Sequence, residues 1–132
     1  MKLPKRNEVV EDLAVVDIAK KGKGVAKNDN LVVFVENAVP GDRLDARITK
    51  RKKSFVEGSP VNFHAYSEYR TTPFCKHFWL CGGCKWQHIT YEGQLALKQK
   101  FVHENLTRIG NVTDFELRDI SPAPSTTYYR NR

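Results

Sequence analysis

The three cysteines of this 132-residue chain lie close together as Cys75, Cys81 and Cys84, with the spacing C-x5-C-x2-C. Thiols this near in sequence can converge on one centre when the loop between them folds back. The neighbouring Gly82 and Gly83 permit the tight backbone that such a loop needs. Thiolates select zinc or iron–sulfur clusters over ions that prefer oxygen. The pattern therefore predicts a soft metal centre held by the three cysteines, in preference to three buried structural cysteines.

The identity of that metal depends on the fourth ligand. His88 follows Cys84 by four residues, so the three cysteines and His88 together match a tetrahedral Cys3His zinc site. His77 is a second candidate for the fourth position. An iron–sulfur cluster ordinarily takes four cysteines, and the chain contains three. Spacing alone leaves both kinds of centre open.

Composition and charge narrow the class of protein. Hydrophobic residues make up 40% and charged residues 28%, as is usual for a folded domain. The net charge of +7 and a pI near 9.4 favour a polyanionic partner, either nucleic acid or an anionic membrane surface. No apolar run approaches the roughly 18 residues of a membrane span, and the amino-terminal residues lack the apolar region of a signal peptide. An odd cysteine count argues against a secreted disulfide framework. We therefore expect a monomeric cytoplasmic protein that does not enter membranes.

Residues 9–63 have the pattern of short β-strands separated by turns. Val15, Val16 and Ile18 predict a short first strand, and the β-branched run at residues 31–35 predicts a central one. Residues 43–50 alternate strictly between apolar and polar side chains, the period of a half-buried strand. Five strands with turns at this spacing predict a small, closed, antiparallel five-stranded barrel resembling an OB fold. A two-sheet sandwich is the alternative.

Two groups of basic residues lie in connections of this predicted barrel. The first group is Lys20, Lys21, Lys23 and Lys27, and the second is Lys50, Arg51, Lys52 and Lys53. A barrel that brings both connections to one face would bind RNA phosphates, which sets affinity without reading sequence. A solvated loop is the alternative interpretation of the second group. Phe55 follows that group and is expected in the barrel core, although an exposed ring there would stack on a base.

One α-helix is predicted at residues 91–108. Thr90 is suited to cap its start, and Gly110 is suited to end it. Five apolar residues fall on one stripe at helical period: Tyr91, Leu95, Val102, Leu106 and Ile109. We expect this helix to be a docking element and not a site.

The cysteine segment resembles a known enzyme family. The run Cys81-Gly82-Gly83-Cys84-Lys85-Trp86-Gln87-His88-Ile89, preceded by Cys75 and followed by Tyr91, Gln94, Lys98 and Lys100, is similar to the cluster segment of the RNA 5-methyluridine methyltransferases. The most similar subgroup methylates large-subunit ribosomal RNA. The resemblance implies that the barrel is the RNA-binding TRAM domain of that family. It also implies that Cys75, Cys81 and Cys84 hold a [4Fe-4S] cluster, with a fourth cysteine from outside this chain.

The resemblance also implies a domain organisation and an activity. The fold would be α+β: a flexible terminus at 1–8, the barrel at 9–63, a cysteine-rich segment plus helix at 64–110, and the truncated start of a central domain at 111–132. In the full enzyme a cysteine thiolate adds to carbon 6 of uracil, S-adenosylmethionine methylates carbon 5, and a base removes the proton. The residues for this chemistry would lie beyond Arg132. We therefore expect no methyltransferase activity from these 132 residues alone.

Two other functions fit parts of the pattern. A stand-alone RNA-binding module with a Cys3His zinc site is the main alternative, and metal identity separates it from the methyltransferase. An iron–sulfur electron carrier is a weaker candidate function, because the fourth cysteine is missing and an electron carrier has no need of a basic barrel.

Overall fold

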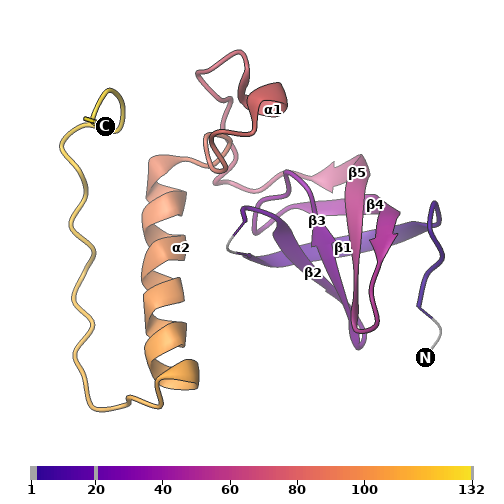
Figure 1. The fold of residues 1–132 in the computed structure, drawn as a ribbon, viewed down its shortest axis with the longest axis horizontal. Coiled ribbons are helices and arrows are strands. Elements are labelled where there is room, and N and C mark those ends of the chain that lie inside the picture. Colours follow the sequence, from indigo (N-terminus) through magenta and orange to yellow (C-terminus); the bar gives the residue numbers. More distant parts are fainter. Residues whose placement is uncertain (1–2, 20, 132) are drawn as a thin grey trace. The chain divides into compact units, whose positions relative to one another are not determined.

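The structure is a computed structural model that describes residues 3–19 and 21–131 (Figure 1). Its elements follow the chain in this order: β1 (Val9–Ile18), β2 (Gly24–Asn28), β3 (Leu31–Val35), β4 (Arg43–Arg51), β5 (Phe55–Ala65), α1 (Phe78–Cys81), α2 (Tyr91–Glu104) and η1 (Asn105–Ile109). The chain divides into two compact units, Met1–Ile89 and Thr90–Arg132. The cysteine segment thus belongs to the same unit as the barrel, and the boundary falls within the predicted 64–110 segment.

In the described chain the five strands close into a barrel in the order β1-β2-β3-β5-β4. The predicted α+β fold, a five-stranded barrel followed by a helix, is confirmed. The expectation of a wholly antiparallel barrel is wrong at one place, because β3 and β5 run parallel. A closed ring of five strands cannot alternate in direction all the way round, since five is an odd number. One parallel pair is therefore required by closure itself.

The barrel core is filled by the inward residues of the alternating strands. Leu44, Ala46 and Ile48 on β4 are fully buried, as their spacing predicts, while Arg43 and Arg47 are exposed. Burying a valine, leucine or isoleucine side chain stabilises a fold by about 1.5–3 kcal/mol. The interior also contains inward residues from the other strands: Val10, Leu13, Val15, Ala26, Leu31, Val33, Val35 and Val56. This apolar interior is the main source of stability in the first unit.

Strand β1 is longer than predicted, because a bulge interrupts its alternation. Val10 pairs with Ala46 and Leu13 with Leu44, and the register shifts between them. Asp12 lies in this bulge with a φ of 56°. Val10 and Leu13 both face inward although they are three residues apart, so the period of two is lost. The sequence pattern therefore revealed only the second half of the strand.

Helix α2 begins where the sequence predicted. The Thr90 hydroxyl accepts a hydrogen bond from the Gly93 amide at 3.2 Å and caps the first turn. The helix continues as the π-helical turn η1 to Ile109, and Gly110 follows its end. No helix in the described ranges is long and apolar enough to cross a membrane.

The predicted apolar stripe is not the buried side of this helix. Gly93 and Leu97 are its buried residues, while Val102 and Ile109 are 47% and 77% exposed. The wider i→i+5 turn of η1 rotates the later side chains away from the α-helical period. The residues after the helix run back alongside it in extended form (Figure 1). The Gln99 side chain holds them by bonding to Arg118 O and Ile120 N at 3.5 and 3.2 Å.

Candidate nucleic-acid interface and cysteine segment

The two predicted groups of basic residues meet at the carboxylate of Glu57 on the outer face of the barrel. Glu57 Oε2 accepts a hydrogen bond from Lys23 Nζ at 2.8 Å, and Lys50 Nζ lies 4.0 Å from the same oxygen. Gly24 on β2 and Glu57 on β5 pair with neighbouring residues of β3, so Lys23 reaches Glu57 across that strand. The barrel therefore brings Lys23 of the first group beside Lys50 of the second.

The surroundings of the Glu57 carboxylate are dominated by positive charge. The hydrogen bond from Lys23 is the main cause that lowers the pKa of Glu57, and the charges of Lys50 and Lys52 act in the same direction. Glu57 stays ionised and forms an ion pair with Lys23. The side chain of Lys23 is 26% exposed, whereas that of Lys50 is 69% exposed. The free positive surface is therefore the β4–β5 loop more than the β1–β2 turn.

The remaining predicted basic residues differ in their surroundings. Arg51, Lys52 and Lys53 are exposed and, with Leu3, line a shallow hollow of about 580 Å³. Lys21 and Lys27 are also exposed. Lys20 lies outside the described residues. Three cations are thus concentrated around the hollow at the β4–β5 loop.

Phe55 is not in the barrel core, which corrects the expectation from its sequence. Its neighbour Val56 points inward and is fully buried, so the alternation of β5 places Phe55 on the outer face. There its ring packs edge-to-face on Phe34 with the centroids 5.1 Å apart. The pair is half-buried and lies beside Glu57, the cross-strand partner of Phe34.

A buried ion pair fixes the connector after β5 to the barrel. The Asp42 carboxylate is fully buried and accepts hydrogen bonds from the amides of Val39 and Ser67 at 2.7 and 2.8 Å. It also accepts a hydrogen bond from Arg70 Nη2 at 2.5 Å, and Arg70 donates a second one to Asn37 O. The ion pair therefore joins the connector at Arg70 to the chain between β3 and β4 at Asp42.

The cysteine segment contains three buried residues and lies against the β1–β2 turn. Phe78, His88 and Ile89 are 7%, 1% and 1% exposed. Gly22, in the β1–β2 turn at a φ of 80°, lies so close that a Cβ there would be 3.0 Å from Lys85 Cβ. Only glycine satisfies both the positive φ and this close approach. The β1–β2 turn thus packs against the cysteine segment at Lys85 and Trp86.

The three cysteines are free thiols that the short helix α1 and its flanks place near the surface. Cys81 and Cys84 are exposed and Cys75 is half-buried. Helix α1 ends at Gly82, whose φ of 69° reverses the chain towards Cys84. Among the described residues, no group of three or more histidine, cysteine or acidic side chains is placed to hold a metal ion. The donor atoms suit a soft metal, but the geometry does not bring the three sulfurs together.

His88 is the most unusual polar residue of the segment. Its ring lies against Phe78 and Trp79, with centroid distances of 5.3 and 5.8 Å, and neither ring nitrogen has a hydrogen-bond partner. The pKa of His88 is lowered to about 4, mainly by burial; the charge of Arg70 acts in the same direction, and that of Asp42 opposes it. The side chain is therefore a neutral imidazole with an unused lone pair. His77, the other candidate ligand, is exposed.

Sequence reasoning missed Glu57 and Asp42. The alternation of residues 55–59 could have predicted Glu57, because it places this residue on the outer face together with Phe55. Nothing local indicated that Asp42 would be the buried partner of a residue far along the chain.

Comparison with known proteins agrees with this geometry. Residues 9–61 match the family model of the TRAM domain. The match covers the five strands of the barrel almost completely, so the barrel is similar to a TRAM domain.

The similarity extends beyond the barrel. An "Uncharacterized RNA methyltransferase" of Porphyromonas gingivalis is 42% identical over 120 residues, which cover 91% of this chain and 26% of that protein. A protein of the same description from Bacteroides thetaiotaomicron is 45% identical over 118 residues, 87% of this chain and 25% of that protein. A third, from Nitratidesulfovibrio vulgaris, is 35% identical over 126 residues, 96% of this chain and 27% of that protein. The chain thus spans about a quarter of the length of the curated relatives it matches.

Proposed function

We propose that this chain is the RNA-binding part of an RNA methyltransferase. RNA binding is supported chiefly by the position of Lys23 and Lys50 on one outer face of a barrel that matches the TRAM model. Residues 51–53 are exposed beside them. Similarity to RNA methyltransferases over nine-tenths of the chain supports the enzyme class. In this proposal the barrel holds the phosphate backbone, and other parts of the enzyme select the base.

We propose further that the reaction forms 5-methyluridine, with S-adenosylmethionine as the methyl donor and ribosomal RNA as the substrate. The support is the cysteine segment, whose run from Cys81 to Ile89 is similar to that of enzymes with this activity. We assign no residue of this chain to the methyl transfer. In this proposal the methyl-donor site and the nucleophile would come from parts of the enzyme that this chain, which spans 26% of one relative, does not cover.

Cys75, Cys81 and Cys84 are the proposed ligands of a [4Fe-4S] cluster, with a fourth ligand from outside this chain. Bound there, the cluster would cross-link a segment that has little apolar core of its own. The methyl transfer moves no electrons, so its role in this proposal is structural. Thiolates that coordinate iron are not available as nucleophiles.

A zinc-containing RNA-binding module is the second candidate, and one observation favours it. His88 is buried with both ring nitrogens unpartnered, and unsatisfied buried nitrogens are rare in native structures. A bond from one of them to a metal would account for this. In this second proposal Cys75, Cys81, Cys84 and His88 would supply the four ligands of a structural zinc site.

Metal analysis of the chain separates these two candidates. Iron and labile sulfide near four per chain after anaerobic reconstitution, as a [4Fe-4S] centre requires, would support the methyltransferase. Replacing Cys81 by serine removes a proposed ligand and should lower both, whereas His88→Ala should leave both unchanged. One zinc per chain without sulfide, lost in His88→Ala but retained in the exposed control His77→Ala, would instead establish the Cys3His site.

The salt dependence of RNA binding tests whether the β4–β5 loop binds phosphates. We expect Lys52→Ala combined with Lys53→Ala to lower the slope of log affinity against log salt by about 1.4. Each phosphate contact with a single strand contributes about 0.7 to that slope. Fluorescence anisotropy with a labelled single-stranded RNA, repeated over a range of salt concentrations, measures it.

The control removes the same charge elsewhere. Lys98→Ala combined with Lys100→Ala changes two exposed lysines of α2 and should leave the slope unchanged. Equal losses in the two double variants would show that only net charge matters and would refute a phosphate site at the loop.

A further inference from the structure

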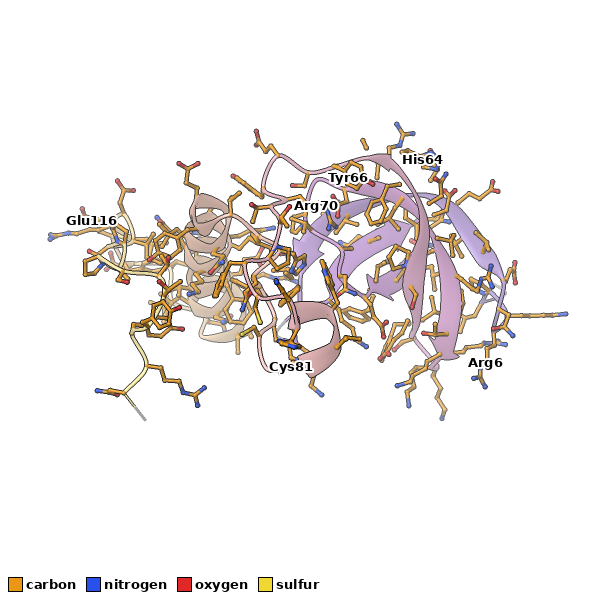
Figure 2. All side chains as sticks on the ribbon, turned by 90° about the horizontal axis from the view of Figure 1, so that it is seen from above. Arg6, His64, Tyr66, Arg70, Cys81 and Glu116 are labelled. Atoms are coloured by element: carbon orange, nitrogen blue, oxygen red, sulfur yellow. The ribbon has the colours of Figure 1, made fainter. Side chains whose placement is uncertain are left out.

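Tyr66 forms an open aromatic platform at the end of the barrel, immediately after β5. Its ring stacks on Phe63 with the centroids 5.0 Å apart and an interplanar angle of 22°. Phe63 in turn packs against the core cluster. Tyr66 nevertheless remains 68% exposed. The Phe63 side of its ring is thus supported by protein while the ring remains largely open to solvent. Figure 2 shows Tyr66, His64 and Arg70 gathered at this end of the first unit.

Arg70 and its partners hold the residues that support the platform. The Arg70 guanidinium carbon lies 5.0 Å from the centroid of Phe63 and 5.8 Å from that of Tyr66. The Asp42 carboxylate accepts hydrogen bonds from Arg70 and from the Ser67 amide. Ser67 Oγ donates a hydrogen bond to Pro40 O at 2.6 Å. A ring with its neighbours fixed in this way loses little conformational entropy when a ligand binds.

The charges around the platform are already paired. Arg70 is bound to Asp42, Arg43 to Asp12, and His64 Nε2 lies 2.7 Å from Asp45 Oδ1. A ligand at Tyr66 therefore meets a flat π-surface and few free cations. Contacts here depend on stacking much more than on phosphate attraction.

We propose that Tyr66 is a stacking site for one unpaired base of the bound RNA, with Phe63 and Arg70 supporting the ring. The inference deepens the RNA binding proposed above and rests on it. Aromatic rings at the surface of OB-type barrels bind bases by stacking, whatever the base, because every base has a π-face. A single strand is required, since a paired base does not expose that face.

Strand β5 links this site to the basic loop. It runs from Phe55, beside the loop, to Ala65, next to Tyr66. At about 3.3 Å per residue its eleven residues span roughly 35 Å. Barrels of this type bind roughly 4–16 nucleotides, so one single strand can contact both ends. The phosphate-binding surface supplies attraction at one end, and Tyr66 supplies a base contact at the other.

The test compares two probes that differ only in their bases. One is a labelled oligouridine of roughly 12 nucleotides, within the site size of such barrels, and the other is an abasic ribose-phosphate oligomer of the same length. Tyr66→Ala should weaken oligouridine binding roughly 5- to 150-fold, the range measured for the loss of one stacked base. It should leave abasic binding and the salt slope unchanged. Tyr66→Phe keeps the ring and should bind like the wild type, and so should Tyr129→Ala, which removes another exposed ring.

Each outcome decides between distinct conclusions. If the wild-type chain binds both oligomers and Tyr66→Ala binds oligouridine equally well, the stacking site is refuted while RNA binding stands. If Tyr66→Ala loses affinity for both probes to the same extent, the ring acts on the fold or the charge, and the stacking site is again refuted. If the wild type binds neither oligomer, RNA binding fails and the site fails with it.

Discussion

Replacing Asp42 by asparagine should lower the free energy of unfolding of the first unit by about 3–5 kcal/mol, the usual cost of breaking a buried ion pair by removing one partner. The Asp42 side chain is fully buried, and that of Arg70 is 19% exposed. The asparagine amide would direct hydrogen-bond donors at groups that are themselves donors: the amides of Val39 and Ser67 and the Arg70 guanidinium. Urea denaturation, followed by circular dichroism of the barrel, measures the change.

A second Asp–Arg pair in the same barrel provides the matched control. Asp12 accepts hydrogen bonds from Arg43, but both side chains are more than half exposed. The Arg43 hydrogen bond lowers the pKa of Asp12, yet water screens an exposed pair of this kind. Asp12→Asn should therefore change stability little, and asparagine tolerates the positive φ at this position. Equal effects of the two variants would contradict the importance we give to burial at Asp42.

Lowering the pH from 6.5 to 4 should destabilise the chelator-treated chain by about 3 kcal/mol through His88 alone, at 1.36 kcal/mol per pH unit. Its folded pKa of about 4 lies below the ordinary value of 6.5. The unfolded chain therefore binds the extra proton between these two values, and stability falls as the pH falls through that window. Urea titrations at several pH values, followed by the fluorescence of Trp79 beside His88, measure the slope.

The control for this prediction removes the titrating group. His88→Phe should remove most of the slope between pH 6.5 and 4, because a phenyl ring keeps the packing against Phe78 without a protonation site. The same substitution at the exposed His77 should leave the slope in place. Glu57, Asp12 and Asp45 also have lowered pKa values, but their unfolded values of 3.8–4.5 put their effects at the acid end of the window or below it. A slope that persists in His88→Phe would refute the assignment.

Local patterns in the sequence were sufficient for the elements of this fold. The alternation of residues 43–50 identified β4 and its inward side, and the hydroxyl of Thr90 identified the start of α2. These features depend on periods of two and 3.6 residues and on one side-chain hydrogen bond, all of which lie within a few residues of chain. The cysteine spacing likewise identified the segment to which a metal is proposed to bind, because C-x5-C-x2-C is itself local.

Register and burial were decided only by the tertiary structure. The bulge at Asp12 hid the first half of β1, because it shifts the strand by one residue relative to β4. The meeting of Lys23 with Glu57 required β3 to lie between their strands. Likewise, only the path of the connector showed that Arg70 is neutralised by Asp42 and that His88 is enclosed by aromatic rings. The sequence by itself thus determined the strands other than the first half of β1, the start of the helix and the cysteine segment. Which distant charges and rings meet depends on long-range pairing, and no local period in the chain encodes it.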